Sequence, residues 1–136
     1  MKKFILYFSL LLFSVILFFS GCTKNNPEPS PSDARSKFIG QWNVTETKKK
    51  LSYQANITTD ASTSDKVFID NFGDFSARAS ASVSGNAITL KPNQTLGTVI
   101  VISGEGTYNS QSNTILWSYI YTDQADQLTV SAIYSK

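Results

Sequence analysis

Cysteine and histidine supply many of the nucleophiles, general bases and metal ligands of enzymes, and this chain of 136 residues has one cysteine, Cys22, and no histidine. A disulfide within the chain, a zinc cluster of cysteine and histidine, and a Ser-His-Asp or Cys-His catalytic arrangement are therefore excluded. Carboxylate, tyrosine, lysine and serine chemistry remain, but these residue types form no tight polar constellation along the sequence. We expect a protein that is not an enzyme, with no catalytic residues, no metal site and no cofactor.

Cys22 directly follows a segment with the parts of an export signal. Residues 1–3 carry two lysines, residues 4–19 are apolar and interrupted only by serine, and the small residues Ser-Gly precede the cysteine. The apolar stretch is shorter than the ~20 residues of a typical membrane-spanning helix, and no stop-transfer flank follows it. We therefore interpret residues 1–21 as a helical signal peptide that is cleaved between Gly21 and Cys22.

The four residues Phe19-Ser20-Gly21-Cys22 resemble the lipobox of bacterial lipoproteins. In that family the cysteine thiol is diacylglycerated, signal peptidase II cuts before it, and the freed amine is acylated. Phe19 stands where the family usually has an aliphatic residue, and this looser form resembles lipoproteins of the Bacteroidetes. The resemblance implies that Cys22 carries palmitate-type chains and anchors the protein in the cell envelope, at the outer membrane, on a face left open. The alternative is an ordinary secretory signal with a cysteine nearby by chance.

Residues 22–37 are rich in proline, serine and asparagine and show no apolar periodicity. Alternating prolines favour extended polyproline geometry at ~3.1 Å per residue, so this segment is predicted to be a flexible tether between the lipid and the rest of the chain. What remains, residues 38–136, is about the length of one domain. The chain therefore divides into a signal peptide (1–21), a lipidated tether (22–37) and one domain (38–136).

The charge of the protein argues against nucleic acid as a partner. The chain has 12 Lys and Arg against 10 Asp and Glu, and two of the lysines leave with the signal peptide, so 10 basic residues remain against 10 acidic ones. Binding to nucleic acid phosphates needs basic residues clustered on one face. The longest basic run, residues 48–50, is three lysines and predicts a solvent-exposed hairpin turn.

The domain is predicted to be all-β, because β-branched and aromatic residues recur in short runs between turn residues and no helical stripe appears. Residues 75–83 alternate apolar and polar, and the turn Ser84-Gly85-Asn86 leads into the next run, as in a β-hairpin. Eight strands are expected, with short connections typical of an up-and-down antiparallel barrel, and a sandwich is the main alternative. They are placed near residues 41–47, 51–59, 66–70, 75–83, 87–91, 96–103, 114–122 and 127–134.

Gly40-Gln41-Trp42 resembles the Gly-X-Trp opening of the calycin superfamily, the lipocalins and their relatives. Residues 83–90, 104–109 and 113–119 add to the likeness, which is to small lipocalin-like lipoproteins of Bacteroidetes. The resemblance implies a lipocalin-like barrel in which Trp42 plugs the closed end. Two features depart from full lipocalins: the domain is shorter and lacks a C-terminal helix, and its last strand offers Lys136 in place of an arginine that would stack on the tryptophan.

A barrel of eight strands holds one small ligand only if some inward residues are small. The alanines of residues 75–83 meet this condition, and the aromatic residues of 114–122 would face them as an apolar wall with polar handles. The alternative is that the aromatic rings fill the space that the alanines leave. The candidate ligand-binding residues are Trp42, Ala77, Ala79, Ala81, Trp117, Tyr119 and Tyr121.

Two functions follow from these expectations. The first is a lipid-anchored barrel that binds a small hydrophobic molecule or a lipid. The second is a structural or interaction module of the cell envelope, including an inhibitor-like one, that has a filled barrel and a protein partner. Both have the membrane as a partner through Cys22.

Overall fold

The computed structural model describes residues 33–47 and 50–136. The predicted signal peptide, its cleavage site, Cys22 and the tether as far as residue 32 lie outside the described residues. Within the described ranges, no helix is both long and apolar enough to cross a membrane.

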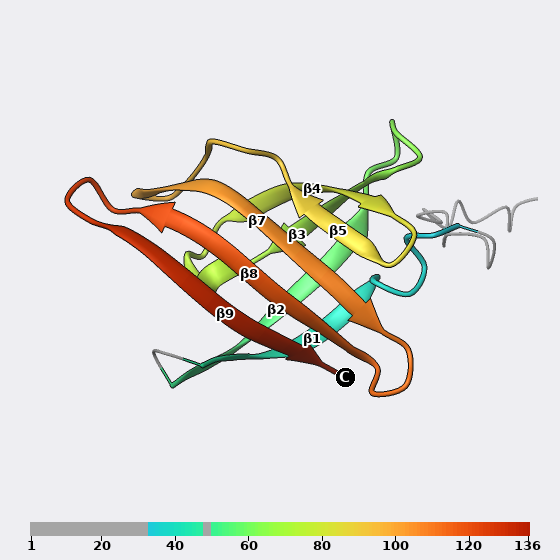
Figure 1. The fold of residues 1–136 in the computed structure, drawn as a ribbon. Coiled ribbons are helices and arrows are strands. Elements are labelled where there is room, and N and C mark those ends of the chain that lie inside the picture. Colours follow the sequence, from blue (N-terminus) through green and yellow to red (C-terminus); the bar gives the residue numbers. More distant parts are fainter. Residues whose placement is uncertain (1–32, 48–49) are drawn as a thin grey trace, which may run out of the picture.

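Nine antiparallel strands and one 3-10 turn make up the described part of the chain (Figure 1). Apolar and polar residues alternate along most of them, so each strand turns one set of side chains inward and the other outward. The elements are β1 (Gly40–Glu46), β2 (Leu51–Thr59), β3 (Lys66–Asp70), η1 (Phe72–Asp74), β4 (Arg78–Ser84), β5 (Ala87–Leu90), β6 (Gln94–Leu96), β7 (Val99–Asn109), β8 (Thr114–Thr122) and β9 (Gln127–Ser135).

The sheet closes into a barrel of eight strands. Each strand from β1 to β4 pairs with the next, β7 pairs with β8 and β8 with β9, and two further pairings, β1 with β9 and β5 with β7, close the ring. β6 lies outside this ring and pairs with the first residues of β7. Figure 1 shows β7, β8 and β9 as the near wall and β1 to β3 behind them. The prediction of an all-β, up-and-down antiparallel barrel is confirmed.

The strand boundaries differ from the predicted ones at two places. The run predicted at 96–103 is two elements, the short β6 and the long β7, with a register irregularity between Val101 and Ser103. The run predicted at 75–83 begins as a strand only at Arg78. Asn71, Asp74 and Ser76 have positive φ angles, which a strand does not allow, so the chain turns through η1 before β4 starts.

One end of the barrel is closed where β1 begins and β9 ends. The Trp42 ring is fully buried, and its indole Nε1 donates to the carbonyl oxygen of Phe38 at 2.7 Å. Lys136 covers this ring with its Nζ atom 4.4 Å from the ring centroid, and the same ammonium donates to the Ile39 carbonyl oxygen at 2.9 Å. Lysine therefore makes the cation–π contact for which the sequence offered no arginine.

The segment 33–37, assigned to the tether from sequence, forms a turn that is attached to the barrel. The Arg35 guanidinium pairs with Asp33 at 2.7 Å and donates through Nη1 to the carbonyl oxygens of Asp60, Thr63 and Lys66. Arginine suits this position because its planar fork can satisfy several carbonyls at once. The chain thus enters the barrel beside the connection between β2 and β3.

Candidate functional site

The predicted site residues all belong to the inner side of the barrel or to its rim. Ala79 and Ala81 on β4 point inward and are buried, and so are Trp117, Tyr119 and Tyr121 on β8. Ala77 precedes β4 and is partly buried against the core. Trp42 closes the far end with Lys136, as described above. The structure therefore brings the alanines and the β8 aromatic residues into one core.

Two glycines on β7 make room for the large rings of β8. Gly104 pairs with Tyr119 across the ladder, and Gly106 pairs with Trp117. A Cβ atom at Gly106 would lie 2.8 Å from the Trp117 ring and 2.8 Å from Cγ2 of Ile88, and a Cβ atom at Gly104 would lie 2.7 Å from Cβ of Tyr119. A side chain at Gly106 would collide with the Trp117 ring, and one at Gly104 would collide with Leu90 and the Cβ atom of Tyr119, which explains the two glycines inside this strand.

Phe72 from η1 occupies space between these rings. Its side chain is fully buried and meets Trp117 edge-on at 5.4 Å and Tyr119 at 4.8 Å between ring centroids. Nearby, Phe75 meets Tyr121 at 5.1 Å. Edge-on contacts of this kind are favourable beyond simple burial. The turn that follows β3 thus inserts an aromatic side chain into the core beside the predicted ligand wall.

A carboxylate lies inside the barrel, among tyrosine hydroxyls. Glu46, the last residue of β1, is fully buried, and its Oε1 atom accepts a hydrogen bond from Tyr119 at 2.6 Å and one from Tyr53 at 3.2 Å. Tyr134 on β9 is buried next to the same group. We call Glu46, Tyr53, Tyr119 and Tyr134 the inner polar cluster.

The inner polar cluster holds its tyrosines in the protonated form. Burial is the largest cause that raises the pKa of Tyr53, Tyr119 and Tyr134, because the phenolate would lose its solvation. The neighbouring carboxylate of Glu46 raises each of these pKa values further. The three hydroxyls therefore stay protonated at neutral pH and do not act as bases.

Two N–H or O–H groups of this core are buried without donating a hydrogen bond. They are the indole Nε1 of Trp117 and the hydroxyl of Tyr134. Tyr53 lies close enough to Tyr134 to influence its pKa, but no contact of the Tyr134 hydroxyl has ordinary hydrogen-bond geometry. An unsatisfied buried donor costs roughly 1–3 kcal/mol, so a water or a ligand atom at this place would be favourable.

The site can bind and orient a molecule, since it offers donors and an apolar wall. Within residues 33–47 and 50–136, no group of three or more Asp, Glu, Cys or His side chains is arranged to hold a metal ion. The aromatic residues of β8 are buried in the barrel as predicted from the sequence, whereas the burial of Glu46 and Phe72 beside them was not predicted. The inward position of Glu46 follows from alternation, because Trp42, Val44 and Glu46 lie two residues apart on one strand.

Comparison with known proteins gives no further assignment. No protein family profile matches the chain, and no curated protein sequence matches it significantly.

Proposed function

We propose that this protein is a lipoprotein of the cell envelope, anchored through Cys22, whose lipocalin-like barrel binds a small neutral amphipathic molecule. The observation that carries the proposal is the Trp117 indole N–H, which is buried in the barrel and unpaired. Because an indole only donates, the bound molecule must present an acceptor oxygen, such as a carbonyl or a hydroxyl.

The surroundings of that N–H define the rest of the ligand. The rings of Phe72, Trp117 and Tyr119 form an apolar wall, which suits the hydrocarbon or aromatic part of the molecule. The buried carboxylate of Glu46 repels a second anion in a medium of low dielectric constant, so a neutral ligand is favoured over a fatty acid. A protein that needed only a stable core would be as well served by an apolar residue at position 46.

Entry of the molecule requires the turn at η1 to move. Asn71, Asp74 and Ser76 adopt left-handed backbone conformations, each of which costs free energy for a residue other than glycine. Phe72, held by this turn, takes up the volume beside Trp117 that a ligand would fill. In this proposal Phe72 occupies the site of the empty protein and withdraws when the ligand binds.

Native mass spectrometry of the full chain, extracted from membranes without denaturation, tests this function. The expected result is a non-covalent mass that is present in the native spectrum and absent after denaturation, whereas acyl chains on Cys22 persist in both. Trp117→Phe should lose the mass, and Trp42→Phe should keep it, because Trp42 donates to Phe38 and not to the ligand. A bare protein in the wild-type native spectrum would contradict the proposal.

The anchor is tested separately by replacing Cys22 with Ser. The variant should leave the membrane fraction, because two or more acyl chains hold a lipoprotein almost permanently and none would remain. A Cys22→Ser protein that stays in the detergent-soluble membrane fraction with its signal peptide removed would overturn the lipoprotein assignment.

A specific observation favours a second function, an interaction module with a filled barrel. Leu116 on β8 and Ile133 on β9 are directly paired across the ladder and are 52% and 44% exposed. Adjacent exposed aliphatic side chains are suited to contact another protein. Crosslinking in membranes that recovers a partner at Leu116 in the wild type and not in Leu116→Ser would support this function over ligand binding.

A further inference from the structure

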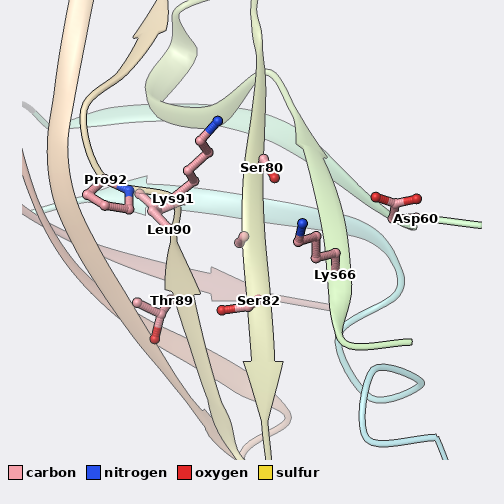
Figure 2. Close-up of a pocket in the computed structure, with 9 residues that line it drawn as sticks. Asp60, Lys66, Ser80, Ser82, Thr89, Leu90, Lys91 and Pro92 are labelled. Carbon is pink, nitrogen blue, oxygen red and sulfur yellow. The ribbon is translucent and has the colours of Figure 1, made fainter. Parts of the chain in front are cut away.

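A groove of about 460 Å³, lined by both polar and apolar residues, lies on the barrel across β4 and its neighbours. Figure 2 shows β4 in the middle of this groove, with Lys66 from β3 on one side and Lys91, which follows β5, on the other. Ser80 from β4 lies between the two lysines in that view, Ser82 lies further along the groove, and Thr89 from β5 lies next to Ser82. The groove is separate from the inner polar cluster.

The register of the three strands explains why these side chains gather. Lys66 pairs with Ser82, and Ser82 pairs with Thr89, so the three side chains form one row across the outer face. Ser80 and Lys91 form the next row, joined by a hydrogen bond from the Lys91 backbone N–H to the Ser80 carbonyl oxygen at 2.8 Å. Neighbouring strands lie ~4.8 Å apart, so the long lysine side chains reach toward β4 from both sides.

The loop that carries Lys91 is fixed to β4 by Gln94. The Gln94 side chain accepts from the Ser80 backbone N–H at 2.8 Å and donates to the carbonyl oxygens of Ser80 at 3.1 Å and Lys91 at 2.9 Å. These three hydrogen bonds take the place of the strand pairing between β4 and β5, which ends at Leu90. The groove wall is therefore ordered before any ligand arrives, which lowers the entropic cost of binding.

Neither ammonium group of the groove forms an ion pair within the described ranges, but Asp60 at the edge of the groove partly offsets the charge of Lys66. Hydrogen bonds from Ser62, and to a smaller extent the charge of Lys66, lower the pKa of the Asp60 carboxyl group. Neither Lys66 nor Lys91 makes a side-chain hydrogen bond or a salt bridge to another residue of the described ranges, whereas Arg78 pairs with Asp70 and Lys37 donates to Asn86. At the edge of the groove, the Asp60 carboxylate is held by Ser62 through two hydrogen bonds of 2.8 and 2.6 Å. A surplus of positive charge therefore remains over β4.

We propose that this groove binds a phosphate group. Lys66 and Lys91 supply two positive charges from opposite sides of β4, with Ser80 between them and with Ser82 and Thr89 further along the groove, and these hydroxyls can donate to phosphate oxygens. A tetrahedral oxyanion can use donors that converge from several directions, which a planar carboxylate with two oxygens cannot do as well. The volume exceeds that of phosphate alone, so the group is carried on a larger molecule.

That molecule is either a soluble phosphorylated compound or a lipid headgroup. The chain enters the barrel through Arg35, whose guanidinium binds the carbonyl oxygens of Asp60 and Lys66, two residues that also line the groove. The groove therefore lies beside the turn at residues 33–35, where the described part of the chain begins, and in a protein anchored as proposed the tether would allow the groove to reach the membrane surface. Both sources offer the same phosphate chemistry, and the experiment separates them.

The test is a titration of the full chain in a nonionic detergent with inorganic phosphate at constant ionic strength, followed by amide NMR shifts. The wild type should show saturable shifts confined to residues 80–82 and 89–91. Lys66→Gln and Lys91→Gln should each weaken phosphate binding by about two- to fivefold, as expected when one of two charged partners is lost from a solvent-exposed anion site. The matched control Lys37→Gln removes one lysine elsewhere and should leave the affinity unchanged.

Repeating the titration in nanodiscs identifies the source. If phosphatidylglycerol discs weaken phosphate binding relative to phosphatidylcholine discs, a lipid headgroup occupies the groove, and if the two agree, the ligand is soluble. Both results uphold a phosphate site. Shifts that rise without saturation, that spread over the whole barrel, or that are the same in Lys66→Gln and Lys91→Gln as in the wild type overturn the proposal.

Discussion

Replacing Tyr119 with phenylalanine removes one atom, the hydroxyl oxygen that donates to Glu46 at 2.6 Å. The ring is 1% exposed, and phenylalanine keeps its shape, so no cavity larger than that oxygen is formed. A hydrogen bond to a charged group contributes ~1.5–3 kcal/mol, and the carboxylate left behind loses its shortest donor. We therefore expect Tyr119→Phe to lower the free energy of unfolding by about 2 kcal/mol, or about 10 °C in Tm for a domain of this size.

Urea unfolding followed by tryptophan fluorescence measures this change. Tyr53→Phe should cost less, about 1 kcal/mol, because its bond to Glu46 is longer, at 3.2 Å. Tyr108→Phe is the matched control: its hydroxyl bonds to the exposed Asn113, and its loss should cost under ~0.5 kcal/mol. A double-mutant cycle with Glu46→Gln should give a coupling of ~1 kcal/mol or more. If Tyr119→Phe behaves like Tyr108→Phe, or if the coupling is zero, the inner polar cluster does not exist as described.

Three further predictions concern the same barrel. Burial raises the pKa of Tyr119, Tyr53 and Tyr134 in the folded state, so the unfolded chain releases these protons first, near pH ~10. The free energy of unfolding should therefore be level below that pH and fall above it, which urea midpoints measured at several pH values would show. A midpoint that stays constant to about pH 11 would contradict this prediction. Gly106→Ala places a Cβ atom 2.8 Å from the Trp117 ring and should cost ~1–3 kcal/mol by overpacking, while Ser103→Ala on the same strand should be nearly neutral in the same urea assay. Lys136→Met should change the Trp42 fluorescence and lower stability by about 1 kcal/mol, Lys136→Arg should restore both, and equal stability of all three proteins would refute the cation–π contact.

The alternation of apolar and polar residues along the sequence was sufficient to predict the barrel. Strands such as β8 alternate so regularly that both their bounds and their inward faces follow from the pattern, and closure follows from the short connections. β6 was missed because three residues after a proline carry too little periodicity to mark a strand. The break at η1 was predicted, but β4 was predicted to start at residue 75 and not at Arg78, because Phe75 and Ala77 continue its alternation, while the positive φ angle at Ser76 depends on local backbone geometry.

The inner polar cluster shows where sequence reasoning ends. That Glu46 points inward can be derived from β1 alone, since it shares a face with Trp42 and Val44. That it meets Tyr119, 73 residues away along the chain, depends on the tilt and register of strands around the whole ring. The unpaired Trp117 indole is likewise a property of packing, because its neighbours come from η1, β7 and β9.

The two tryptophans allow the most direct test of the proposed ligand site. Trp42 donates its indole N–H to Phe38, and Trp117 has no such partner in the described structure. We would record the two indole N–H resonances by NMR on the full chain purified natively and again after its small molecules have been stripped by unfolding and refolding. We expect the Trp117 resonance to shift between the two samples, while the Trp42 resonance stays in place. Two identical spectra would contradict it.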